Sequence, residues 1–127
     1  MTRHGVLVAA CVLLLAAACD NTPTTPEGTV VGSFGGEGIL LTAERTRVAL
    51  FLRCNTVLTD KPLVPDRDGR FTLAATWQKF TPAVLRGNLS GPAINVEVIV
   101  VTSDTIFRQQ YTAVRDQPGD IFAICAL

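Results

Sequence analysis

Residues that could act as nucleophiles in this chain lack the bases that would activate them. The single histidine is His4, close to the N-terminus. A serine nucleophile needs an adjacent general base, most often an imidazole. His4 lies in the N-terminal segment that we expect to be removed as a signal peptide, as argued below. Without it, catalytic triads, histidine general bases and His-ligated metal sites are excluded. The serines stand beside turn signals, where we expect structural roles: Ser33, Ser90 and Ser103.

Carboxylates offer two further candidate chemistries. Glu37, Glu44 and Glu97 could supply the acid and base of a glycoside hydrolase, but nothing in the sequence brings two of them together, so we expect solvated side chains. The run Asp66-Arg67-Asp68-Gly69 resembles the start of a calcium loop. Such a loop needs a bidentate glutamate at its twelfth position, which here is Trp77. We therefore expect an Asx or type I turn, with no metal site and no cofactor.

Cys19 lies in a sequence context that gives it a chemical role. An uncharged run of 14 residues, 5–18, follows Arg3. It is too short for a spanning helix, which needs about 20 apolar residues, and is typical of a signal peptide. Ala16-Ala17-Ala18 then places small side chains before Cys19. The pattern resembles the lipobox of bacterial secretory lipoproteins, although Ala16 stands where leucine is commoner.

The lipobox resemblance implies the domain organisation and the location of the protein. Residues 1–18 would be a signal peptide, and Cys19 would carry a diacylglyceryl thioether and an N-acyl chain that anchor it to the membrane. The polar segment 19–28 (CDNTPTTPEG) would be a flexible tether, followed by a domain over 29–127. The implied location is the bacterial cell envelope, facing the periplasm or the extracellular side. The alternative is a soluble secreted protein that begins with a cysteine.

The composition of the mature chain limits its partners. Removal of residues 1–18 from the 127-residue chain leaves 109 residues, enough for one domain with a modest core. Loss of Arg3 leaves ten basic residues against 11 acidic ones, a net charge of about −1. A nucleic-acid partner needs a basic face. We therefore expect no nucleic-acid partner.

The domain has the alternation of apolar and polar residues that is typical of β-strands. Turn signals such as Pro65-Asp66-Arg67-Asp68-Gly69 and Ser90-Gly91-Pro92 separate the runs. The absence of a helical pattern predicts an all-β fold, a small antiparallel eight-stranded barrel or sandwich. The predicted strands are 29–34, 38–44, 46–54, 70–79, 83–90, 93–102, 105–114 and 120–126.

Two cysteines remain in the mature domain besides Cys19. Cys54 and Cys125 both fall at the inward phase of their predicted strands. In an oxidising compartment such a pair favours a disulfide, closing a loop of about 70 residues. The alternative is two free buried thiols. A zinc site needs more ligands than two thiolates provide.

The domain also resembles a group of small disulfide-bonded bacterial lipoproteins without an assigned activity. The group has an aromatic-Gly-Gly segment, an apolar strand, a strand ending in cysteine, an Asp-x-x-Gly-x-Phe turn, a Ser-Gly turn and a closing cysteine. The resemblance supports the fold and the disulfide and adds no chemistry. The matching positions here are Phe34-Gly35-Gly36, Ile39-Leu40-Leu41, Cys54, Asp66–Phe71, Ser90-Gly91 and Cys125.

Aromatic residues mark the candidate binding surface. We expect Trp77 and Phe107 in the core, and Phe51 and Tyr111 as candidates for an exposed binding surface. The function expected is a non-catalytic binding or interaction module of the cell envelope, with a protein or an envelope polymer as partner. The alternative is a lipocalin-like carrier of a small apolar ligand. An apolar cavity above roughly 300 Å³ would favour the carrier.

Overall fold

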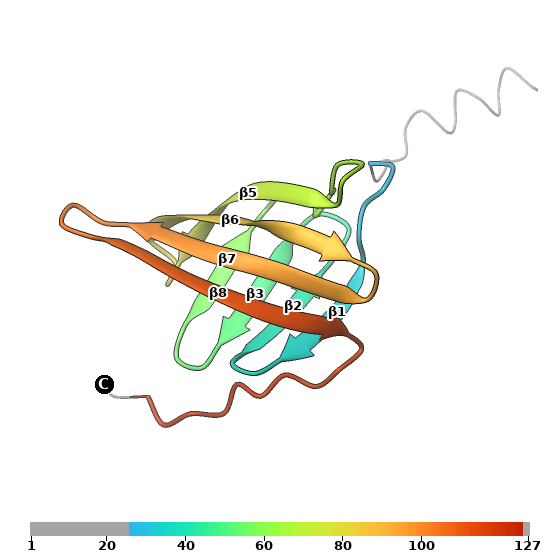
Figure 1. Cartoon of the computed structure of the whole chain (residues 1–127). Coiled ribbons are helices and arrows are strands. Elements are labelled where there is room, and N and C mark those ends of the chain that lie inside the picture. The colour runs from blue at the N-terminus through green and yellow to red at the C-terminus, as the bar shows by residue number, and fades with distance from the viewer. Residues whose placement is uncertain (1–25, 126–127) are drawn as a thin grey trace, which may run out of the picture.

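The predicted alternation produces eight antiparallel strands that close into a barrel (Figure 1). The structure is a computed structural model that describes residues 26–125. Every strand pairs with its neighbours in sequence, and β8 returns to β1. The closed barrel therefore settles the choice between barrel and sandwich. The strands are β1 (Gly32–Gly36), β2 (Ile39–Ala43), β3 (Val48–Leu52), β4 (Thr56–Thr59), β5 (Arg70–Trp77), β6 (Thr81–Ser90), β7 (Ala93–Val101) and β8 (Ile106–Arg115).

The number of strands was predicted correctly, but one predicted strand is wrong and one observed strand was missed. Residues 121–125 form no strand, and the only β-bridge of the described C-terminal segment is the isolated one between Glu37 and Asp120. Instead of pairing along a strand, the segment is held at its described end by the disulfide of Cys125. The missed strand is β4, which pairs Val57 with Leu50 and with Trp77. Its four residues are too few for a clear alternation.

The barrel interior is packed with apolar side chains. Phe34, Leu50, Leu85 and Ile94 are among those that are almost completely buried. Inward positions of each strand supply this core, as the alternation predicts. Small eight-stranded barrels are filled by side chains in this way. Hydrophobic burial inside the barrel therefore stabilises the fold.

A narrow seam between β1 and β8 closes the barrel. Only Phe34↔Arg115 and Gly35↔Val114 are paired there, whereas β7 and β8 pair over nine positions. The guanidinium carbon of Arg115 lies 4.7 Å from the centre of the Phe34 ring. Its Nη1 donates a hydrogen bond of 3.1 Å to the carbonyl oxygen of Val31. The Arg115 side chain thus braces the short ladder between β1 and β8.

The antiparallel course gives the barrel two distinct ends. The described chain begins at one end, where the Val30 amide donates to the Leu63 carbonyl oxygen at 2.8 Å. The turns after β1, β3, β5 and β7 lie at the opposite end, which we call the hairpin end (Figure 1). The segment after β8 runs back along the outside of the barrel to the hairpin end (Figure 1). There Cys125 forms a disulfide with Cys54.

The disulfide pairing was predicted correctly, but the burial of the two cysteines was not. Cys54 and Cys125 are bonded across 71 positions of sequence. Both residues are exposed. Cys54 lies two residues beyond Leu52, the last residue of β3, and so is outside the alternation that placed it inward. The bond therefore fastens the C-terminal segment to the surface and does not cross the core.

Candidate functional site

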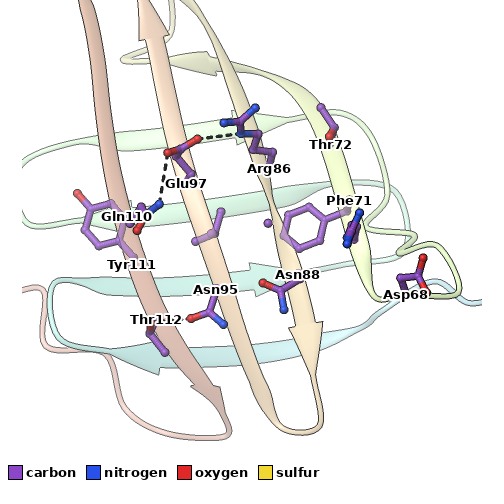
Figure 2. A pocket seen from close by; sticks show the side chains of 13 residues that line it. Asp68, Phe71, Thr72, Arg86, Asn88, Asn95, Glu97, Gln110, Tyr111 and Thr112 are labelled. Carbon is purple, nitrogen blue, oxygen red and sulfur yellow. Dashed lines mark hydrogen bonds and ion pairs between the residues drawn. The ribbon is translucent and has the colours of Figure 1, made fainter.

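A long polar hollow crosses the outer face of β5, β6, β7 and β8 (Figure 2). We call it the polar trough; its volume is about 730 Å³. Its floor follows one row of the sheet, in which Phe71, Gly87, Val96 and Tyr111 are paired in turn. Because the side chains of this row lie on the inner face of the sheet, the floor is largely backbone.

Outward side chains on either side of that row form the two walls of the trough. The register pairs each wall residue with the next across the four strands. One wall carries an ion pair and the other carries amides, so the walls differ in chemistry. The first wall is Thr72, Arg86, Glu97 and Gln110, and the second is Arg70, Asn88, Asn95 and Thr112, with Asp68 beside its β5 end.

Gly87 is required for the close approach of two strands beneath the trough. A Cβ atom at Gly87 would clash with the carbonyl oxygen of Asn95 on β7. Glycine in a strand commonly marks a bend or a close backbone contact. Because Gly87 has no side chain, β6 and β7 can approach closely here, and this determines the local shape of the trough floor.

The charged groups of the trough are paired with one another. Nε of Arg86 donates to Oε1 of Glu97 at 2.8 Å, and the side chain of Glu97 is only 15% exposed. Nε2 of Gln110 donates to Oε2 of the same carboxylate at 3.5 Å. The hydrogen bond from Arg86 is the main cause that holds the pKa of Glu97 below its usual value. Glu97 is therefore an ionised structural partner and a poor candidate for a general acid.

A second candidate surface lies at the hairpin end. Six large apolar side chains are exposed there, and we call this set the apolar rim. Their exposed fractions run from 44% for Phe107 to 94% for Ile124. They come from three segments that are separate in sequence: the β5–β6 turn, the β7–β8 hairpin and the C-terminal segment. The members are Phe80, Val101, Ile106, Phe107, Phe122 and Ile124.

Specific contacts hold the three segments of the rim in place. The Trp77 and Phe107 rings lie 5.7 Å apart between centroids, which joins β5 to β8. Nε2 of Gln78 donates to the Cys54 carbonyl oxygen at 3.3 Å, which joins the β5–β6 turn to the β3–β4 turn. The disulfide to Cys125 extends this network to the C-terminal segment. Phe80, which is 88% exposed, therefore projects from a braced turn.

The two residues predicted from the sequence as a binding surface do not share a face. Phe51 lies on the outer side of β3, in a smaller hollow of about 220 Å³ with Leu58 and Asp60. Tyr111 packs against the core and lines the polar trough. Burial raises the pKa of the Tyr111 phenol above its usual value. The structure therefore does not join Phe51 and Tyr111 into one site.

The core assignment of Phe107 was wrong, and that of Trp77 was right in part. Trp77 is partly buried and packs against the core cluster. Phe107 is 44% exposed although its phase on β8 is inward. The reason is that β8 pairs with β1 only near Arg115, so the other half of β8 is flanked by β7 alone and its inner face is less enclosed. Sequence reasoning also missed Phe80 and Phe122, whose positions beside turns hid their exposure.

The remaining predicted residues have structural roles or no resolved role. Oδ1 of Asp66 accepts from the amides of Asp68 and Arg70, each at 2.9 Å, which confirms the Asx turn. Within residues 26–125, no group of three or more His, Cys, Asp or Glu side chains could hold a metal ion. Oε2 of Glu44 accepts from Arg47 at 2.9 Å on the surface.

Several predictions concern residues that the structure does not describe. The signal peptide over 1–18, the lipidation site Cys19 and the tether up to residue 25 lie outside the described residues. Among residues 26–125, no helix has the length and apolar character needed to span a membrane. No family model, curated protein or solved structure matches this chain.

Proposed function

We propose that this chain is a lipid-anchored, non-catalytic interaction module of the bacterial cell envelope, and that it docks a partner protein through the apolar rim. The lipid on Cys19 would anchor the chain in the membrane, and residues 19–28 would form the tether between this anchor and the domain. The observation that carries the proposal is that three segments at the hairpin end expose six large apolar side chains. Exposed apolar patches on small soluble domains commonly mark interaction sites.

The shape and bracing of the rim support a docking role. Its aromatic members, Phe80, Phe107 and Phe122, are of the kind that anchor protein interfaces. The disulfide and the Gln78 hydrogen bond fix two of its segments before any partner arrives. Pre-organised side chains lose less conformational entropy on binding. The rim is also at the end opposite to the described start of the chain (Figure 1). This arrangement would present it away from the tether.

The packed interior favours docking over carriage of an apolar ligand. The carrier alternative needs an apolar cavity inside the barrel. The side chains of Phe34, Leu50 and Ile94 are fully buried there. Both hollows described for residues 26–125 are lined mostly by outward-facing side chains. Binding on the outer surface therefore fits the barrel better than binding within it.

Native mass spectrometry of the protein extracted from membranes in mild detergent tests the proposal. We expect an acylated mass starting at Cys19 and a protein adduct that is lost in the variant Phe80→Ser/Ile106→Ser. The control variant Asn88→Ser, on the polar trough, should keep the adduct. An unacylated mass would overturn the anchor. The absence of a protein adduct would overturn the docking role, and an apolar small-molecule adduct that survives the rim variant would support the carrier.

A further inference from the structure

The dimensions of the polar trough suit an extended, linear ligand. The trough crosses four neighbouring strands, β5 to β8 (Figure 2). Strands lie about 4.8 Å apart, so the outer two are roughly 14 Å from each other. The two walls are two residues apart along each strand, a separation of roughly 7 Å. A slot of these proportions accommodates a single-file chain and not a globular ligand.

The charges of the trough argue against an ionic ligand. Arg70 and Arg86 are balanced by Asp68 and Glu97, and Arg86 is already bonded to Glu97 at 2.8 Å. Sites for phosphates or carboxylates carry an excess of arginine or lysine, and cation sites carry an excess of carboxylates. The trough has neither. Its charge balance therefore selects for an uncharged ligand.

The uncharged wall residues offer donors and acceptors in alternation. Oγ1 of Thr112 donates to Oδ1 of Asn95 at 2.7 Å, which leaves the amide hydrogens of Asn95 free to donate. Among the described residues, no hydrogen bond engages the half-buried side chain of Asn88. Amides provide both donors and acceptors. A ligand with hydroxyl groups, each of which donates and accepts, complements such a wall.

From this geometry and chemistry, we propose that the polar trough binds a linear, uncharged oligosaccharide. The chain of sugar rings lies across β5 to β8 above the backbone of the Gly87 row. Asn88 and Asn95 on the second wall and Gln110 on the first hydrogen-bond its hydroxyl groups, and the Arg86–Glu97 pair holds the first wall in shape. The site is separate from the apolar rim, so it goes beyond the docking role proposed above and does not depend on it.

Titration of the mature chain with chitohexaose and cellohexaose tests this assignment. The binding is measured by calorimetry and by amide chemical shifts. We expect at least one hexasaccharide to bind and to shift the amides of β6, β7 and β8. Replacement of one hydrogen-bonding amide, in Gln110→Ala or Asn88→Ala, should weaken binding about fivefold, since one net hydrogen bond contributes about 1 kcal/mol. Affinity should change little with added salt, because the ligand carries no charge.

Gln109→Ala is the matched control. Gln109 is exposed and next to Gln110, but it lies on the other face of β8 and outside the trough. It should bind the sugars as the unaltered chain does. A thermal melt of each variant confirms that it folds. The proposal is wrong if neither hexasaccharide binds at millimolar concentration, if Gln109→Ala weakens binding as much as Gln110→Ala, or if inorganic phosphate competes for the trough.

Discussion

Removal of the Arg115 guanidinium should weaken the seam where β1 and β8 close the barrel. The variant Arg115→Met keeps most of the aliphatic stem but loses the contact with Phe34 at 4.7 Å and the hydrogen bond to Val31 at 3.1 Å. A cation–π contact with a buried ring contributes about 1–2 kcal/mol, and a net hydrogen bond contributes about 1 kcal/mol. We therefore expect the free energy of unfolding to fall by about 2–3 kcal/mol. For a domain of this size that loss lowers the Tm by roughly 10–20 °C.

Urea unfolding of a double-mutant cycle separates the ring contact from the rest. The cycle compares Arg115→Met, Phe34→Leu and the double variant with the unaltered chain. We expect a coupling energy of about 1 kcal/mol between the two positions. Arg108→Met, on an exposed part of the same strand, is the control and should change stability little. A coupling energy of zero within error would refute the reasoning, because the short ladder between β1 and β8 would then hold the seam alone.

Three further predictions follow from the core, the disulfide and the trough. Leu50→Ala, at a fully buried position, should lower the free energy of unfolding by about 2–5 kcal/mol in urea unfolding, and a loss below about 1 kcal/mol would contradict the packed interior. The double variant Cys54→Ser/Cys125→Ser should lose up to about 4 kcal/mol, given the 71-position separation, and an unchanged Tm would show that the bond does not restrain the unfolded chain. The lowered pKa of Glu97 stabilises the fold above its unfolded value of 4.5, and this contribution is lost as the pH falls through the folded pKa. Arg86→Gln should raise the Glu97 pKa in an NMR titration, and an unchanged pKa would contradict the assigned cause.

Strand pattern was the part of the fold that the sequence predicted best. Alternation locates β5, β6 and β7 within a few residues, because each is long and has one apolar face. It fails for 120–126, where Ile121, Ala123 and Cys125 have the spacing of one strand face although Phe122 and Ile124 between them are apolar too. The pattern cannot reveal that β1 and β8 have already closed the sheet. Closure is a property of the whole chain, and local alternation carries no information about it.

Neither candidate surface was predictable in the same way. The apolar rim lies on three segments that are separate in sequence, and the pairing of strands and the disulfide bring these segments to the same end of the barrel. Phe107 illustrates the difficulty. Its side chain is in the inward phase of β8, but it is exposed because β1 does not pair with that part of β8. The polar trough is built from residues that read one by one as solvated strand positions. Their grouping depends on the register of four strands.

The seam between β1 and β8 also determines how the chain folds. All other strand pairs join neighbours in sequence, so hairpins can form one after another with little loop-closure entropy. Among the strand pairings described, that of β1 with β8 is the one that spans most of the domain, and it has a high contact order. During synthesis from the N-terminus, β8 emerges last. The open sheet must therefore wait for its final strand, and Cys125 reaches Cys54 only after that strand has arrived.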